Sequence, residues 1–516
     1  MSSATLPSGA TLRGLSYANS SAYLGVRFAQ PPVGDLRWRA PLPFAHARGK
    51  TYNATAFGLP CTQEVEPFSE DCLFLNVFAP RHAAKLPVLV YIHGGCFMAD
   101  STRNALFNGT HLVELAARGA SGAVPVILVT IQYRLGVYGW LGGGALRDTS
   151  GATGNWGLMD QRLALRWVRD NIGAFGGDRD RVTLFGHSAG AAAVSAHLVS
   201  PASTGLFSRA GVISGTMANW GSHSAEAAER NFEHALASVN CSTLACLLDV
   251  AENDPVRLQR AARWSWKGRT PCRDGCSFAP VIDGVEQLDW PLAVARRAAS
   301  LTVSFGRVPL LHGTTLDDGY GFVKNDNFFN LTNAATPAQC DTYVRGAWGA
   351  ALSANLTSLY PPSSYKPWLP NTNNDSMCFV AAARMETDFA YACTARQASR
   401  LSAAPVYRYL FSMHTPDGAD AEWVPHGHDL PFVFQIDTDP TQATAPARAL
   451  ARTMLGYWTR FAASGDPAGR WPRFDHGEQL LRLDANVSTA AGWHDFECDT
   501  WDRAWPTIGE CTPTPV

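Results

Sequence analysis

A short stretch that ends at Gly190 constrains the fold of this chain more than any other feature. Residues 182–190 read Val-Thr-Leu-Phe-Gly-His-Ser-Ala-Gly, and a run of Ala, Val and Ser follows over 191–196. The apolar start predicts a buried strand, and the small residues predict a helix that packs closely against it. A serine at such a strand-to-helix corner sits on a tight turn with its hydroxyl exposed. Ser188 is therefore the first candidate for a catalytic nucleophile.

The bulk composition restricts the class of protein. The chain has 516 residues, 46% of them hydrophobic, and its 45 Gly and 32 Pro are spread without a repeat, linker or low-complexity tract. We therefore expect one large domain over residues 1–516 with helical insertions. Only 17% of the residues are charged and the net charge is −2, which disfavours a nucleic-acid partner. No apolar run reaches the roughly 18 residues that a membrane span requires.

Apolar runs and helical patterns alternate along the chain. Helices are expected over Leu158–Ile172 and Ala447–Ala463, and Pro446 suits the start of the second helix. Several apolar runs are continuous, as in strands that are covered on both faces. The alternation predicts an α/β fold with a large, mostly parallel central sheet flanked by helices. The expected strands are Val88–Ile92, Val124–Ile131, Val182–Gly186, Gly211–Ser214, Val308–His312 and Val406–Phe411.

A serine nucleophile needs a base, an acid that orients the base, and N–H donors for the oxyanion. We expect the N–H donors in the segment His93-Gly94-Gly95-Cys96-Phe97, which follows an apolar run. Glycines there let the backbone approach a substrate oxygen closely. A further donor is the N–H of Ala189, next to the nucleophile. Because the backbone N–H of Cys96 donates whatever its side chain is, this side chain need not be reactive.

The acid and the base each have two candidates. Asp317 and Asp318 follow the apolar run that ends at His312, and a carboxylate at the end of a strand suits a buried orienting role. His426 and His428 lie later in the chain, which is the order Ser, acid, His that α/β-hydrolases use. Chemistry alone separates neither the two carboxylates nor the two histidines.

Five segments resemble those of type B carboxylesterases, the cholinesterase-like α/β-hydrolases, and they occur in the order of that family. The resemblance covers nearly the whole chain and implies the α/β-hydrolase fold and serine carboxylesterase activity. The segments are Gly25–Gly34, Ser69–Val77, Gly154–Gln161, Phe175–Asp178 and the turn around Ser188.

The same resemblance implies a role for each candidate. The acid falls on Asp318, where most members of the family carry Glu, and the base falls on His426, because the family's catalytic histidine precedes a glycine. Asp317 and His428 then become structural neighbours. The oxyanion donors fall on Gly95, Cys96 and Ala189.

Cysteines and sequons indicate the compartment. Twelve cysteines, several in close pairs, and eight Asn-x-Ser/Thr sequons favour an oxidising, extracellular setting. Because the polar start lacks the apolar stretch of a signal peptide, we expect a leader that is absent from this chain. The sequons favour a secreted glycoprotein of a fungal type. They are Asn19, Asn53, Asn108, Asn240, Asn330, Asn355, Asn374 and Asn486.

The resemblance also implies structural pairs. The ion pairs Arg37–Glu70 and Arg134–Asp178 belong to the scaffold, and Cys96 and Cys511 are left without a pairing. No cysteine pair has a second Cys/His pair at zinc-site spacing, so neither a metal nor a cofactor is expected. The expected disulfides are Cys61–Cys72, Cys241–Cys246 and Cys393–Cys498 from the family, with Cys272–Cys276 and Cys340–Cys378 as additions.

Two departures from the family pattern bear on the substrate. The segment between Cys61 and Cys72 is short, with Phe68 as its only aromatic residue, whereas lipases carry a long lid there and cholinesterases a tryptophan for choline. His187 stands where cholinesterases carry a glutamate. We therefore expect a general carboxylic-ester hydrolase for small-molecule esters, with an open apolar pocket. Its candidate walls are Met217, Trp220, Tyr320 and Phe322.

Other functions are weighed against this one. A lipase or sterol esterase that acts on long-chain lipid esters is the main alternative. A non-catalytic adhesion protein of the same family is disfavoured, because the serine, acid, histidine and both turn glycines are all present. The sequence does not indicate the oligomeric state.

Overall fold

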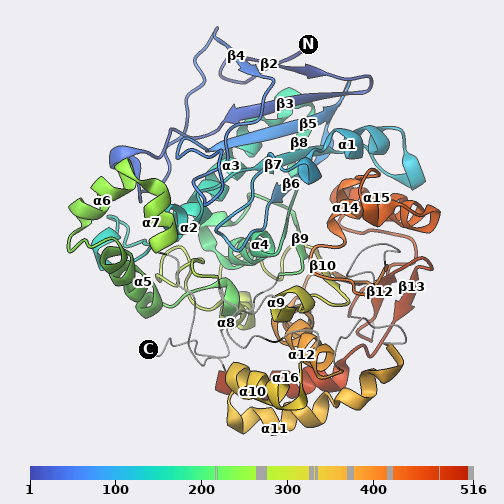
Figure 1. Ribbon diagram of the computed structural model, residues 1–516. Helices are drawn as coiled ribbons and strands as arrows, with labels where there is room; N and C mark the ends of the chain where they lie inside the picture. Colours follow the sequence, from blue (N-terminus) through green and yellow to red (C-terminus); the bar gives the residue numbers. More distant parts are fainter. Residues whose placement is uncertain are drawn as a thin grey trace.

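The fold is built around one large sheet with helices on both faces (Figure 1). The computed structural model describes residues 1–516 except 216, 218, 263–275, 325–330, 332–334, 369–376, 415–421, 476 and 509–516. Within the described residues the sheet has thirteen strands. Twelve of them follow the order β1-β2-β3-β5-β7-β6-β8-β9-β10-β11-β12-β13, and β4 pairs with β2. Their bounds are β1 Ser2–Thr5, β2 Thr11–Ser16, β3 Ser20–Arg27, β4 Thr51–Ala54, β5 Phe74–Pro80, β6 Leu86–Ile92, β7 Ile127–Ile131, β8 Gly177–His187, β9 Arg209–Ile213, β10 Leu310–Thr315, β11 Val406–Phe411, β12 Leu480–Leu483 and β13 Ser488–Ala490.

The centre of the sheet is parallel. Strands β7, β6, β8, β9, β10, β11 and β12 pair in parallel in that order, whereas β1, β5 and β13 pair antiparallel to their neighbours. The expected α/β architecture is confirmed. Because parallel strands end at the same edge of a sheet, the loops after β6, β8 and β10 gather there, which is where open α/β sheets bind ligands.

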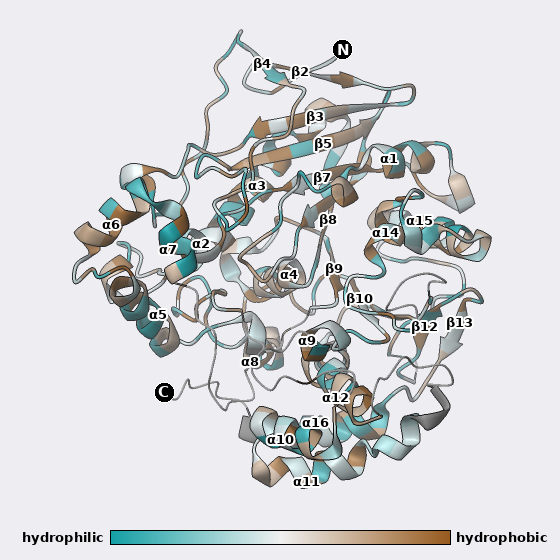
Figure 2. Cartoon of the chain, in the orientation of Figure 1, coloured by the Kyte–Doolittle hydropathy of each residue, from teal (hydrophilic) through white to brown (hydrophobic). Residues whose placement is uncertain are grey.

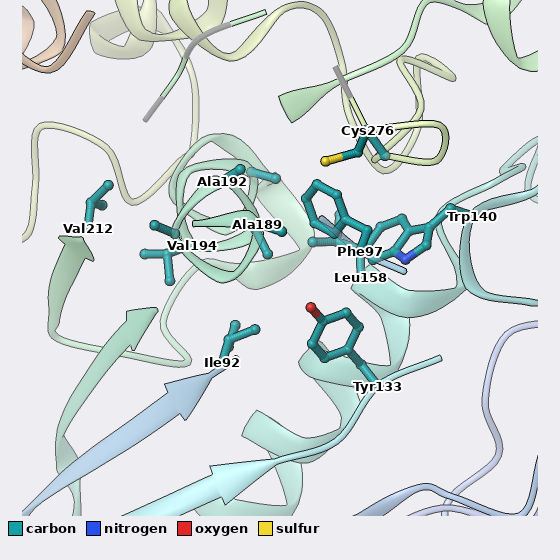
Figure 3. Close-up of a cluster of buried hydrophobic side chains, with 14 of the residues drawn as sticks. Ile92, Phe97, Tyr133, Trp140, Leu158, Ala189, Ala192, Val194, Val212 and Cys276 are labelled. Atoms are coloured by element: carbon teal, nitrogen blue, oxygen red, sulfur yellow. The ribbon is translucent and has the colours of Figure 1, made fainter. Parts of the chain in front are cut away.

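Strand β6 shows why helices cover both faces. Val88, Val90 and Ile92 lie in one core cluster, and Leu89 and Tyr91 lie in the other, because successive side chains of a strand point to opposite faces. The first cluster contains α3 and α4 residues, and Figure 3 shows part of it. The second contains residues of α1, α14 and α15. The helices are α1 Thr110–Ala117, α2 Gly136–Trp140, α3 Trp156–Asn171, α4 Ala189–Val199, α5 Ala225–Ser238, α6 Leu244–Asn253, α7 Pro255–Ala261, α8 Pro291–Arg296, α9 Tyr320–Lys324, α10 Pro337–Trp348, α11 Ala350–Leu359, α12 Met377–Thr387, α13 Cys393–Leu401, α14 Leu430–Phe434, α15 Ala445–Ser464 and α16 Asp495–Ile508.

The expected strands and helices are all present, although some of their ends differ. Strand β7 begins at Ile127 and not at Val124, and β10 begins at Leu310 and not at Val308. In both segments a proline, Pro125 or Pro309, precedes the strand. Proline has no N–H for the hydrogen-bond ladder, so each strand begins after it.

The outer helices carry their apolar residues on one side. Figure 2 shows mixed teal and brown surfaces on α5, α6 and α15, as expected where one face packs and the other meets solvent. Helices α10, α11, α12 and α16 gather at the end of the molecule opposite β2 and β4 (Figure 1). In the part of the chain that the structure describes, no helix is both long enough and apolar enough to cross a bilayer.

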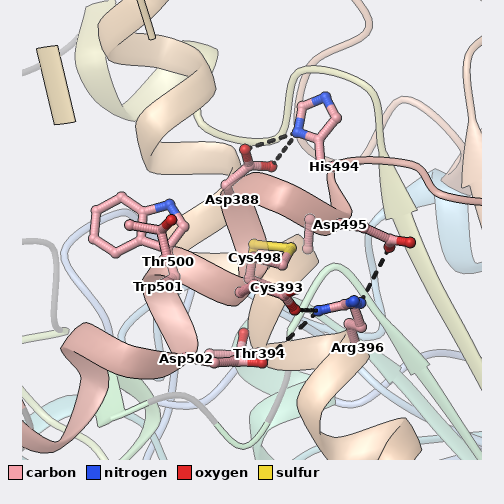
Figure 4. Close-up of a disulfide and its surroundings, with 12 residues drawn as sticks. Asp388, Cys393, Thr394, Arg396, His494, Asp495, Cys498, Thr500, Trp501 and Asp502 are labelled. Carbon is pink, nitrogen blue, oxygen red and sulfur yellow. Dashed lines mark hydrogen bonds and ion pairs between the residues drawn. A yellow bond between two sulfur atoms is a disulfide. The ribbon is translucent and has the colours of Figure 1, made fainter. Parts of the chain in front are cut away.

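Four expected disulfides are present: Cys61–Cys72, Cys241–Cys246, Cys340–Cys378 and Cys393–Cys498. The last one joins α13 to α16 beside a cluster of ion pairs around Arg396 (Figure 4). The expected pair Cys272–Cys276 is wrong, because the sulfur of Cys276 is bonded to Cys96. Cys272 and Cys511 lie outside the described residues.

One of the two expected ion pairs is also wrong. Arg37 and Glu70 pair as expected, with 2.6 Å between Nε and Oε2. Arg134, however, pairs with the buried Asp160 of α3 at 2.8 Å, and Asp178 pairs with Arg181. Arg134 follows the carboxyl end of β7, whereas Asp178 lies at the amino end of β8. The two strands run in the same direction, so these residues lie at opposite edges of the sheet.

Candidate active site

Ser188 occupies a strained turn between β8 and α4. Its backbone has φ 56° and ψ −125°, a region that residues other than glycine rarely adopt. A Cβ atom on Gly186 would lie 2.5 Å from the backbone of Gly190, and one on Gly190 would lie 2.1 Å from the carbonyl oxygen of Ile92. Both flanking positions therefore require glycine, which explains the Gly-x-Ser-x-Gly pattern.

The loop over residues 93–97, called the glycine loop below, passes directly beside this turn. A Cβ atom on Gly94 would lie 3.0 Å from the Cβ of Ser188. Among the described residues, no acceptor binds the N–H of Gly95 or Cys96. The N–H of Ala189 lies at the first position of α4, where a helix leaves its N–H groups without an intrahelical partner. The region next to the serine thus offers N–H donors to an incoming anion.

A buried carboxylate holds one of the two candidate histidines. His426 Nδ1 lies 2.8 Å from Asp318 Oδ1, and Asp318 has no solvent exposure. The other oxygen, Oδ2, accepts hydrogen bonds from the Thr315 N–H at 2.8 Å and from Ser214 Oγ at 3.0 Å. These donors fix the carboxylate, and the carboxylate fixes the ring. His428 instead lies near the ring of Phe411.

The His426 ring lies beside the serine turn among aromatic side chains. Its centroid is 4.5 Å from that of His187, 5.1 Å from Tyr391 and 5.2 Å from Phe322. Its Nε2 is buried and has no hydrogen-bond partner within the described chain, so no hydrogen bond joins it to Ser188. Such catalytic contacts are often long in a free enzyme and shorten when substrate binds.

His187 is an uncharged neighbour of that ring. Burial first, and then the nearby His426, lower the pKa of His187 well below its ordinary value. The ring of His187 therefore stays neutral near pH 7 and supplies no counter-charge for a cationic substrate. The site next to the serine is therefore uncharged on this side.

The four expected pocket walls divide into two pairs. Trp220 and Phe322 are half-buried and flank Tyr391, with ring centroids 6.0 Å and 5.9 Å away. Met217 and Tyr320 are each only 2% exposed. The Tyr320 ring is stacked on Trp423 at 4.2 Å, which places it in the core.

Tyr391 is a site residue that no motif in the sequence marks. It lies in a π-helical turn over Asp388–Ala392, between α12 and α13. Single π-turns within α-helices occur frequently at functional sites. The turn directs Tyr391 to a place between Trp220, Phe322 and His426, and no residue type in the sequence signals such a turn.

Asp317 has a structural position, as the resemblance implies. Its Oδ2 accepts the N–H of Val424 at 2.9 Å, and its Oδ1 lies 2.9 Å from the guanidinium of Arg384. Burial raises the pKa of Asp317. These contacts attach the loop that carries His426 to the end of β10, so Asp317 helps to bring that histidine to Asp318.

A mostly parallel sheet with a strained serine after one strand, and a buried Asp–His pair beside it, defines an α/β-hydrolase. The model of the carboxylesterase family matches residues 3–501. The chain therefore belongs to the carboxylesterase family and is a serine carboxylesterase that hydrolyses carboxylic esters.

Curated relatives align along nearly the whole chain. The para-nitrobenzyl esterase of Bacillus subtilis is 32% identical over 94% of this chain and 95% of its own length. The human cocaine esterase is 31% identical over 95% of this chain and 88% of its own. The acylcarnitine hydrolase of Mus musculus is 30% identical with the same coverage.

Proposed function

We propose that this enzyme cleaves soluble, apolar carboxylic esters through Ser188, His426 and Asp318. The observation that carries the proposal is the 2.8 Å contact between His426 Nδ1 and Asp318 Oδ1, on a ring that packs against the residue before the serine. With Nδ1 held by the carboxylate, Nε2 is the nitrogen left to accept a proton.

The reaction proceeds in two halves. His426 Nε2 takes the proton of Ser188 as the hydroxyl oxygen attacks the ester carbonyl carbon. His426 then gives this proton to the leaving alcohol, and an acyl-enzyme remains on Ser188. Water, deprotonated by His426, then attacks the acyl carbon. As the bond from this carbon to the Ser188 oxygen breaks, His426 returns the proton to that oxygen, and the acid is released.

The oxyanion of each tetrahedral intermediate is held by backbone donors. We assign this role to the N–H groups of Gly95, Cys96 and Ala189, which lie beside the serine without acceptors of their own within the described chain. Removal of one such donor typically costs on the order of 10²–10³ in kcat.

The aromatic surroundings support apolar substrates. Phe322, Tyr391 and Trp220 form a row that begins at the His426 ring. His187 is uncharged, and the short segment between Cys61 and Cys72 leaves no long lid. Relatives named for a nitrobenzyl ester, cocaine and acylcarnitine differ widely in their substrates, which agrees with a general esterase. We assign Met217 and Tyr320, which are each only 2% exposed, to the protein interior and not to the pocket wall.

The five described disulfides support an oxidising compartment, and we infer that the enzyme is secreted and acts as one catalytic domain over residues 1–516. Small-molecule esters are its proposed partners.

Replacement of the nucleophile tests the proposal. The Ser188→Ala enzyme is expected to lose turnover of p-nitrophenyl butyrate and labelling by a fluorophosphonate probe, while its near-UV circular dichroism matches that of the wild type. Turnover near the wild-type rate would refute the role of Ser188. Wild-type rates on emulsified long-chain triglycerides above those on short-chain esters would favour a lipase instead.

A further inference from the structure

The glycine loop carries a covalent bond that the proposed mechanism does not use. Cys96 is bonded to Cys276, 180 residues later in the chain. One end of this disulfide is a residue whose backbone N–H we assign to the oxyanion site. The other end belongs to a segment that contacts His223 and, in α5, Asn231. The bond therefore joins a catalytic loop to a separate scaffold.

The backbone around Cys96 is unfavourable by itself. Three consecutive residues have left-handed φ values: Gly95 at 94°, Cys96 at 53° and Phe97 at 58°. Left-handed backbone is sterically unfavourable for each residue other than glycine. An unrestrained loop with two such residues has a strong tendency to relax, so neighbouring contacts must hold it.

Two sets of contacts, made by Phe97 and by the carbonyl oxygen of Gly95, hold the residues on either side of Cys96. The carbonyl oxygen of Phe97 accepts the N–H of Gly136 at 2.7 Å, and the fully buried Phe97 ring packs against Trp140 at 4.8 Å. The carbonyl oxygen of Gly95 accepts the N–H groups of Met98 and Ala99. These contacts fix the loop around Cys96, and the disulfide is the contact at Cys96 itself.

The Cys276 end is a rigid anchor. Cys276 is only 3% exposed, and Figure 3 shows it in the buried cluster that contains Phe97 and Ala192. Its carbonyl oxygen lies 3.0 Å from His223 Nε2, while Asn231 Nδ2 lies 3.2 Å from His223 Nδ1. Burial lowers the pKa of His223 to about 4, so this ring is neutral and donates from Nε2.

The anchor continues into paired backbone. The N–H of His223 donates to the carbonyl oxygen of Pro280 at 2.8 Å, and the N–H of Ile282 donates to the carbonyl oxygen of His223 at 2.8 Å. Asn231 also donates to the carbonyl oxygen of Ser277 at 3.2 Å. Cys276 and the residues that follow it are thus tied to His223 and Asn231.

We propose that the Cys96–Cys276 disulfide is a positioning pair, which holds the N–H groups of Gly95 and Cys96 in the orientation that receives the oxyanion. This inference rests on the proposed role of those N–H groups. Without the bond, Cys96 leaves its left-handed backbone and the donors turn away from Ser188. The loss then falls on the transition state and not on ground-state binding of the ester.

The test removes the bond from the anchor side. In the Cys276→Ser enzyme, kcat on p-nitrophenyl butyrate is expected to fall about tenfold or more, part of the 10²–10³ typical of one lost donor, while KM changes less than about threefold. Ser188 adds to the carbonyl of a trifluoromethyl ketone, and the ketone oxygen then becomes an oxyanion. The affinity of the variant for this inhibitor should fall by the same factor as kcat/KM. The matched methyl ketone, which stays trigonal, should bind as it does to the wild type.

A second disulfide supplies the matched control. Cys241–Cys246 closes a short turn between α5 and α6. The Cys241→Ser/Cys246→Ser enzyme should keep the wild-type kcat and both ketone affinities. If Cys276→Ser fails to fold, the Cys276→Ala enzyme carries the same measurements, because alanine places no hydroxyl at this buried position and residue 96 remains a residue other than glycine.

The outcomes separate this inference from the proposed function. A folded variant without the bond whose kcat stays within threefold of the wild type, beside an inactive Ser188→Ala enzyme, overturns the positioning role alone. Equal weakening of both ketones also overturns it, because the loss would then lie in general binding. Turnover by Ser188→Ala would overturn the proposed function and this inference together.

Discussion

Tyr409 donates a hydrogen bond of 2.6 Å from its hydroxyl to Oδ2 of Asp429, and both buried residues interact with the charge of Asp318. The Tyr409 ring fills the space above Gly313, where a Cβ atom would lie 1.8 Å from the ring. Burial raises the pKa of Asp429 to about 6, although the hydrogen bond from Tyr409 opposes the shift. A second carboxyl group next to the site therefore takes up a proton near pH 6.

This raised pKa has a consequence for stability. Between the ordinary aspartate pKa and about 6, the folded state binds a proton more tightly than the unfolded state, so the free energy of unfolding falls as the pH rises through this window. The Asp429→Asn enzyme has no carboxyl group to titrate here, although its amide oxygen still accepts from Tyr409. Its free energy of unfolding should therefore fall less than that of the wild type over this window, by about 2 kcal/mol. Urea unfolding at pH 4, 5, 6 and 7 measures it, and parallel curves for the two proteins would contradict the prediction.

The two loop histidines should differ sharply in their effect on turnover. His426 contacts Asp318, whereas His428 lies near Phe411. His426→Ala should lower kcat about 10⁴-fold or more, as expected for the loss of a triad base. His428→Ala should keep kcat within about threefold, because the His428 ring lies near Phe411 and Asp318 is bound to His426 instead. Steady-state hydrolysis of p-nitrophenyl butyrate decides between them, and the reverse result would exchange their roles.

His494 and Asp388 should make thermal stability depend on pH. His494 Nδ1 lies 2.7 Å from Oδ2 of the fully buried Asp388, where the π-helical turn begins (Figure 4). Burial lowers the pKa of His494, but the charge of Asp388 and its hydrogen bond outweigh burial, so the pKa stands above its ordinary value. The stabilisation by this ion pair is therefore complete below about pH 6.5, the pKa of histidine in the unfolded chain. It is lost as the pH rises through the pKa of His494 in the folded protein.

The measurement is the melting temperature of wild type and His494→Gln between pH 6 and 8.5. The gap between the two proteins should narrow as the pH rises, since only the wild type loses an ion pair. His82→Gln, at an exposed histidine, should follow the wild-type curve throughout. A gap that is constant with pH would show that the ion pair does not titrate in this range.

Glycosylation is expected at the exposed sequons. Within the described chain, Asn53 and Asn108 are exposed, and each accepts a hydrogen bond from the hydroxyl of its own sequon threonine, at 2.9 Å and 2.8 Å. After expression in a glycosylating eukaryotic host, peptide mass spectrometry should find both asparagines converted to aspartate by a peptide N-glycosidase. Unmodified asparagine at both sites would refute the prediction. The other exposed sequon residues are Asn19, Asn240, Asn355 and Asn486, while Asn330 and Asn374 lie outside the described residues.

The serine turn was predictable because its constraints are local. Gly186 and Gly190 are required by backbone contacts within the turn and with the end of β6. The order of strands and helices was predictable for a related reason, since each apolar run is a short continuous segment. The exact strand ends followed Pro125 and Pro309, whose effect on hydrogen bonding outweighed the apolar pattern.

Long-range pairings were not predictable in the same way. Cys276 has a cysteine four positions earlier, yet its sulfur meets Cys96 from a loop after β6. Arg134 pairs with Asp160 because α3 places that carboxylate at the same edge of the sheet. In each pair, the distance along the chain gave no indication of the distance in space.

The sequence by itself determined the parallel sheet, the glycine-flanked serine and the chemical types available to the site, since hydrophobic periodicity and backbone sterics act over a few residues. The family resemblance had already assigned the base to His426 and the acid to Asp318. Only the tertiary structure decided that Tyr391 packs on the His426 ring and that Cys96 is tied to Cys276. These contacts join segments far apart in the chain, and their geometry follows from how the sheet and its helices pack.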